Sequence, residues 1–157
     1  MRVVIGQSAM RFLPEVSSKP LMLAGVMMPD HEGLMDITDG DVVTQSLLQA
    51  ISSLVGYKEI CQWTQDLLEK DGITDSLVYL EKVLPLLGGM KILQVSISLE
   101  TKRPLLADLL EAMKCNLAKI LQIAPERVGI SLFDSNGLTD VSCGDGIGSL
   151  CALTVSG

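Results

Sequence analysis

The sequence has very few histidine and aromatic residues, and fewer basic than acidic side chains. Among its 157 residues His31 is the one histidine, aromatics make up 3%, and 12 Lys and Arg stand against 19 Asp and Glu, for a net charge of −7. Nucleic-acid grooves need clustered basic side chains, and single strands also need aromatic stacking platforms. The composition therefore excludes nucleic acid as a partner.

Long apolar runs and paired cysteine motifs are also absent. No run reaches the ~18 residues of a membrane span, and the residues after Met1 enter a predicted strand without a signal-peptide stretch. We therefore expect a cytoplasmic protein without a membrane partner. No C-x-x-C spacing occurs, so we expect reduced, packed thiols at Cys61, Cys115, Cys143 and Cys151.

Hydrophobic patterning predicts an α+β fold in a single domain, residues 1–157. The clearest strand is 93–100, where Leu, Val and Ile alternate with polar residues. Helices are indicated by apolar residues three and four positions apart and by Asp, Ser or Pro at their starts. The predicted strands are 2–6, 20–26, 93–100, 128–132 and 147–155, the predicted helices are 43–54, 76–87 and 104–121, and the predicted loop or irregular segments are 29–40 and 57–74.

This order of elements favours a mixed, mainly antiparallel sheet with helices packed on one face. The other face of the 93–100 strand is polar, so a second cover such as a partner subunit is expected. His31 stands in a turn-rich segment between two acidic residues. We expect it to be a solvated loop residue rather than a ligand.

Three separated segments carry a family pattern. They are IGQSAMRF at 5–12, PLMLAGV at 20–26 followed by DGDV at 39–42, and GDGI at 144–147. Together they resemble the 2-C-methyl-D-erythritol 2,4-cyclodiphosphate synthase family, in order and along essentially the whole chain. The resemblance implies an enzyme family that forms a cyclic diphosphate in non-mevalonate isoprenoid synthesis and releases CMP. It also implies a homotrimer with active sites between subunits and a central apolar channel.

The same resemblance implies a zinc ion, held by Asp-x-His in the first segment and by a His in the helix after DGDV. The corresponding residues here are Ser8, Met10 and Gln45. Zinc takes thiolate, imidazole or carboxylate ligands, and a hydroxyl, a thioether and an amide do not form such a site. We therefore expect degenerate metal-ligand positions, no metal and no cofactor.

Other positions of the family pattern have changed as well. The family's P-K pair becomes Pro104-Leu105, and its T-T-T-E segment becomes 133–136. The resemblance implies that the missing Lys contacts the cytidine nucleotide and that the missing Glu holds magnesium. The residues expected to remain as a ligand cleft are Asp39, Asp41, Asp66, Lys102, Arg103, Pro104 and Ser135.

Several of these residues have two interpretations. Asp39 and Asp41 are either a catalytic carboxylate pair or a helix cap, and their place before a helix favours the cap. Asp66 either contacts a polyol or is a surface acid. Lys102 and Arg103 either hold a phosphate or are solvated at a helix entrance.

Two functions are consistent with the family resemblance and the changed positions. The first is a non-catalytic homologue of the synthase, a trimeric binding or structural protein without zinc. The alternative is a divergent or repurposed enzyme acting on a phosphorylated metabolite in the intersubunit cleft, related to non-mevalonate isoprenoid synthesis. The joint change at Ser8, Met10 and Gln45 favours the first. The expected partners are further copies in a homotrimer, together with a protein or a small phosphorylated or apolar ligand.

Overall fold

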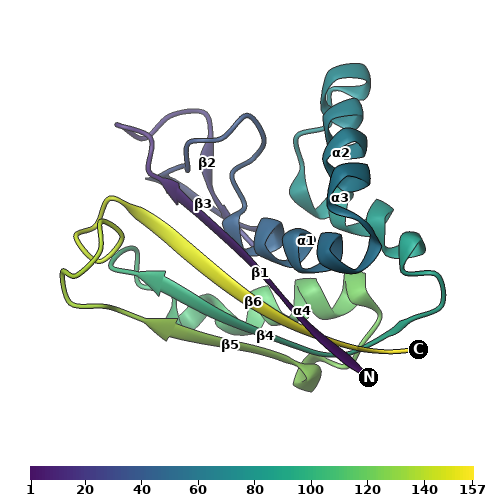
Figure 1. Ribbon diagram of the computed structural model, residues 1–157. Coiled ribbons are helices and arrows are strands. Elements are labelled where there is room, and N and C mark those ends of the chain that lie inside the picture. The colour runs from purple at the N-terminus through teal and green to yellow at the C-terminus, as the bar shows by residue number, and fades with distance from the viewer.

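A four-stranded sheet forms the centre of the computed structural model, which describes all residues, 1–157. Its strands are β1 (Arg2–Arg11), β4 (Lys91–Thr101), β5 (Val128–Phe133) and β6 (Gly146–Ser156), in the order β1-β6-β4-β5. β6 is antiparallel to both neighbours, whereas β4 and β5 are parallel. Figure 1 shows the purple first strand beside the yellow last strand. The predicted mixed, mainly antiparallel sheet is confirmed.

Helices cover one face of this sheet, as predicted (Figure 1). α1 (Val42–Val55) packs on β1 and β6, and α4 (Leu110–Leu121) packs on β5. α2 (Tyr57–Asp71) contacts α1, and α3 (Ser76–Val83) contacts both α1 and α4. Three short 3-10 helices are η1 (Leu84–Leu87), η2 (Ala107–Leu109) and η3 (Pro125–Arg127). None of the helices has the length and apolar character needed to cross a membrane.

The core lies between the sheet and the helices. In β4 the side chains of Val95, Ile97 and Leu99 are buried, as the alternation in the sequence predicts. Leu47 and Ile51 of α1 belong to the same buried cluster. Each such aliphatic side chain stabilises the fold by about 1.5–3 kcal/mol through its removal from water.

The opposite face of the sheet is open in the single chain. Val3, Ile5 and Leu150 are exposed there, at 63%, 66% and 44%. Ile5, Leu150 and Ser96 surround a hollow of about 440 Å³ on this face. Exposed apolar side chains gathered in this way are typical of a contact surface.

The segment predicted as a strand and a loop is instead a β-hairpin. β2 (Pro20–Leu23) and β3 (Val26–Glu32) pair in antiparallel fashion around Ala24 and Gly25, whose φ angles are +48° and +74°. The two N–H groups of this turn donate to the carboxylate of Asp41 at 2.8 and 2.9 Å. The sequence does not indicate the turn, because alanine rarely adopts a positive φ and the stabilising carboxylate is distant in the chain.

Two helices differ from their predicted bounds. Residues 57–71 form α2, where the sequence predicts an irregular segment. Only Ile60 and Leu67 of α2 are buried, so its apolar stripe is too narrow to be recognised. The helix predicted from Pro104 begins only at Leu110, because a loop and the 3-10 turn η2 come first.

Candidate functional site

Ser8, Met10 and Gln45 come from two elements that pack together. Ser8 and Met10 lie two residues apart in β1, so both side chains share the face that Gly6 turns toward α1. Gln45 lies in the first turns of α1. The fold therefore brings the strand and the helix that carry these residues into contact.

The Gln45 side chain is engaged in a polar network that the sequence does not indicate. Its Nε2 donates to Asp36 Oδ2 at 2.6 Å and to Thr38 Oγ1 at 2.9 Å. Thr38 Oγ1 also donates to Asp36 Oδ2, and Lys19 Nζ donates to the Asp36 carbonyl at 2.5 Å. Burial by itself raises the pKa of Asp36, but hydrogen bonds from Thr38 and Gln45 outweigh it, so this pKa is lowered.

This network forms one wall of a small pocket between the 36–38 loop, α1 and α2. The pocket has a volume of about 190 Å³, and Leu48 and Ile60 supply apolar surface opposite Asp36 and Gln45. Tyr57 and Cys61 stand at its α2 side, where the hydrogen bond between them raises the pKa of Tyr57. The pocket can therefore hold a small ligand with one polar and one apolar side.

Asp39 and Asp41 hold the scaffold together at the edge of this pocket. Asp41 caps α1, as predicted, by accepting from Thr44 N at 3.0 Å. It is fully buried, and burial raises its pKa to about 6 although its hydrogen bonds oppose the shift. Asp39 instead accepts from Ser76 N at 2.9 Å and from Ser76 Oγ at 2.5 Å at the start of α3. The pair stabilises two helix starts and the β2–β3 turn.

Asp66 is partly exposed on α2 and does not line the pocket. Its carboxylate is 3.1 Å from Lys70 Nζ and 3.2 Å from Gln62 Nε2. The hydrogen bond from Lys70 is the main cause of its lowered pKa. Within the single chain the structure does not bring Asp66 to the other predicted site residues.

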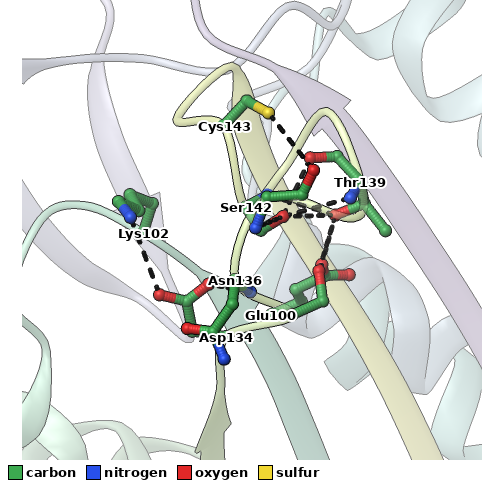
Figure 2. A network of polar contacts seen from close by, with 9 residues as sticks. Glu100, Lys102, Asp134, Asn136, Thr139, Ser142 and Cys143 are labelled. Atoms are coloured by element: carbon green, nitrogen blue, oxygen red, sulfur yellow. Dashed lines mark hydrogen bonds and ion pairs between the residues drawn. The ribbon is translucent and has the colours of Figure 1, made fainter.

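A second polar cluster lies where the parallel strands β4 and β5 end. Glu100 Oε1 accepts from Ser135 Oγ at 2.6 Å and from Thr139 Oγ1. Figure 2 shows Glu100 pointing toward Thr139, with Ser142 beside it in the loop between β5 and β6. Lys102 Nζ is 4.0 Å from Asp134 Oδ2, also drawn there. The structure thus brings Lys102 and Ser135 to one end of the sheet, around a glutamate that the sequence does not single out.

Arg103 is held by the scaffold and is not a free cation. Its Nη1 donates to both carboxylate oxygens of Glu32, at 3.2 and 3.0 Å, and its Nε donates to Gly144 O at 3.1 Å. Its guanidinium carbon lies 4.4 Å from the centroid of the Phe12 ring. Pro104 follows it in the loop before η2.

His31 is part of the same packing, so the expectation of a solvated loop histidine is wrong. It lies in β3, its side chain is 16% exposed, and its ring centroid is 4.9 Å from that of Phe12. Its Nε2 is 3.5 Å from Arg103 Nη1. The neighbours that bury it, Phe12 and Arg103, lie just after β1 and β4 in the chain, which its local sequence does not indicate.

The resemblance implies zinc ligands at the positions of Ser8, Met10 and Gln45, and the expectation that these positions are degenerate stays a prediction. Ser8, Met10 and Gln45 offer a hydroxyl, a thioether and an amide, and zinc sites in proteins use thiolate, imidazole or carboxylate. No group of three or more His, Cys, Asp or Glu side chains lies close enough together to hold a metal ion.

Comparison with known proteins relates the whole chain to one family. A protein-family model, the YgbB family, matches residues 1–156. The chain is 40% identical to 2-C-methyl-D-erythritol 2,4-cyclodiphosphate synthase of Chlamydia caviae over 156 residues, which cover 99% of this chain and 89% of the relative. It is 39% identical to the synthase of Chlamydia abortus over 155 residues, which cover 98% of this chain and 88% of the relative.

Solved structures have the same fold. A structure of 2C-methyl-D-erythritol-2,4-cyclodiphosphate synthase aligns with a TM-score of 0.84 at 25% identity, covering 99% of this chain and 100% of the other. The bifunctional IspDF from Campylobacter jejuni aligns with a TM-score of 0.85 at 24% identity, covering 98% of this chain and 41% of that protein. The likeness to IspDF, at 24% identity, shows the fold alone.

These findings overturn the prediction of a non-catalytic homologue. The relatives that are 40% and 39% identical along nearly the whole chain are named as synthases, that is, as enzymes. The changes at Ser8, Met10 and Gln45, like the other changes in the family pattern, do not take the chain out of that class. The family resemblance of the segments at 5–12, 20–26 and 144–147 is confirmed by the full-length match, and this chain belongs to the YgbB family.

Proposed function

We propose that this chain is an enzyme with the activity named for its Chlamydia relatives, 2-C-methyl-D-erythritol 2,4-cyclodiphosphate synthase. The observation that carries the proposal is the 40% identity over 99% of the chain. The resemblance implies a reaction in which one phosphate of the substrate attacks another and CMP leaves. Such a transfer depends on holding the two phosphates in position and neutralising their charge.

Two parts of the chain supply groups suited to these tasks. The pocket between α1 and α2 presents the hydroxyl of Thr38 and the amide of Gln45 beside apolar surface, which suits a polyol with a hydrocarbon branch. At the end of β4, Lys102 has one weak ionic partner at 4.0 Å. Its ammonium group neutralises a phosphate in the proposed reaction, and the hydroxyl of Ser135 stands at the same loop.

We also propose that the two parts meet across subunits of a homotrimer. The pocket and the Lys102 end belong to different elements, α1 with α2 and β4 with β5. The exposed apolar face around Ile5 and Leu150 supports a subunit contact, because water otherwise covers these side chains. In this assembly one subunit supplies the pocket and its neighbour supplies Lys102.

Ser8, Met10 and Gln45 occupy, in this proposal, the positions of the family's metal-binding side chains. That these three positions hold no zinc stays a prediction. Four other expectations stay predictions: the single domain over 1–157, the cytoplasmic location, the contact of Asp66 with a polyol, and an additional protein or apolar ligand.

The proposal is tested by CMP release from the cytidylyl diphosphate substrate of the family. The purified chain is incubated with substrate, with and without added zinc and magnesium, beside the Chlamydia caviae relative. We expect release above the blank and a loss of about tenfold or more in kcat/KM for Lys102→Ala. Lys82→Ala, at an exposed position on α3, serves as the control. No release in any buffer in which the relative turns over would overturn the proposal.

A further inference from the structure

The first residues of β4 have a strand partner on one side only. β6 pairs with Lys91, Ile92 and Gln94, with an irregularity between the last two. β5 begins to pair with β4 only at Val95. None of the turn, loop or cap hydrogen bonds involves the backbone of residues 91–94. This short strand edge therefore has no strand partner on the β5 side, where η3 is the element that contacts β4, and its backbone groups are available to another strand.

The free edge lines a large groove. The groove has a volume of about 1140 Å³, and its other walls come from α3, η1 and the C-terminal half of α4. Leu77, Leu84, Ile120 and Ile123 line it, and each packs on the core while staying partly exposed. The groove lies on the helix side, away from the face with Ile5 and Leu150, so a trimer formed through that face leaves it open.

Unpaired cations surround this groove. Its walls include three basic residues that take part in no ion pair: Lys91, Lys119 and Arg127. The one acidic residue among its walls is Glu81. The whole chain carries a net charge of −7, so this concentration of positive charge differs from the rest of the surface. Such a patch attracts and orients a negatively charged partner.

We propose that this groove docks an extended acidic segment of a partner protein, which adds as a strand beside residues 91–94. The main chain of the segment pairs with the free edge of β4, in line with β5. Its acidic side chains contact Lys91, Lys119 and Arg127, and its apolar side chains enter the spaces between Leu77 and Ile120. A helical partner does not use the free strand edge, and a basic partner is repelled by the cations.

Selection of peptides from a random displayed library on the purified full chain tests this proposal. We expect the selected peptides to alternate acidic and apolar residues. Their affinity, measured by fluorescence anisotropy, should fall about tenfold between low salt and ~0.15 M salt. Lys119→Glu should weaken binding by about tenfold or more. If this variant does not fold, Arg127→Glu replaces it, with the same expected effect. Lys58→Glu changes the charge equally on exposed α2 and should leave binding within about twofold.

Hydrogen exchange separates strand addition from other modes of docking. A peptide that pairs with β4 should slow exchange of the amides in residues 91–94, whereas docking through side chains alone leaves them unchanged. Peptides without acidic enrichment, equal binding to Lys119→Glu and Lys58→Glu, or unchanged exchange at 91–94 would each overturn the proposal. Concentration-dependent growth of the chain's own assemblies that is blocked by Lys119→Glu would also overturn it, in favour of a second copy.

Discussion

Gly6 of β1 lies against Ala50 of α1 so closely that a Cβ on Gly6 would stand 2.2 Å from the backbone nitrogen of Ala50. The same Cβ would stand 2.1 Å from the carbonyl oxygen of Ser46. Both neighbours are backbone atoms of a helix, which cannot rotate aside. The missing side chain therefore sets how near α1 approaches the sheet.

Gly6→Ala should destabilise the protein by about 3 kcal/mol or more, because α1 must move away from the sheet to make room. Chemical denaturation measures the loss. Gly148→Ala is the matched control, since its Cβ would meet its nearest atoms at 3.8 and 3.9 Å, ordinary contact distances. Equal stability of the two variants would show that the approach of α1 is not fixed by Gly6.

Asp41 should make the protein less stable as the pH rises from about 4 to about 6. Burial raises its pKa in the folded state from 3.8 to about 6. The folded protein therefore binds more protons than the unfolded chain in this window. The stabilisation that protonated Asp41 gives is fully present below the pKa of the unfolded state, and it is lost as the pH rises through the pKa of the folded state. Unfolding free energies at about pH 4 and about pH 7, on either side of this window, measure the effect. Asp41→Asn should flatten the difference, and an unchanged slope in this variant would contradict the assignment.

Cys151 should be the last of the four thiols to react with a thiol reagent. It is buried in β6, and burial raises its pKa to about 12, so the thiolate is scarce at neutral pH. Cys61, Cys115 and Cys143 are exposed, so the expectation of packed thiols is wrong for these three. Labelling with a disulfide reagent should modify Cys151 only on unfolding, and Cys151→Ala should leave the early phase unchanged. Modification of Cys151 in the native protein at the rate of Cys115 would contradict this prediction.

Lys102 and Arg103 are neighbours with different expected roles. Arg103→Met should destabilise the protein by about 1–2 kcal/mol, because it removes the contacts with Glu32, Phe12 and Gly144. Lys102→Met should leave the stability within about 0.5 kcal/mol and lower kcat/KM instead. Thermal unfolding and CMP release, measured on both variants, separate the roles. Loss of stability in Lys102→Met with full activity would reverse the two assignments.

The sequence predicts the sheet better than the polar clusters, for physical reasons. Alternation in 93–100 is a local signal of a half-buried strand, and Val95, Ile97 and Leu99 are buried as it indicates. The link from Glu100 to Thr139 joins residues 39 apart, and neither has a neighbouring pattern that predicts the other. The same holds for the hairpin turn at Ala24, which depends on a carboxylate 17 residues away.

The functional prediction failed where it relied on a few positions. Ser8, Met10 and Gln45 are three positions of the chain, whereas substrate binding and positioning depend on many residues along it. The identity of 40% over 99% of the chain samples all of them. The polar network that the structure shows around Gln45 and Asp36 was not indicated because the 29–40 segment has no regular pattern.

The pairing of β1 with β6 also constrains how the chain folds. The register runs from Arg2 opposite Val155 to Arg11 opposite Gly146, so β1 finds its partner only after nearly all other residues have been synthesised. Contacts between segments so far apart slow folding, because a long loop must close before they form. On the ribosome, β1 therefore waits without a strand partner while α1 and α3 emerge, and its backbone N–H and C=O groups stay unpaired until β6 arrives.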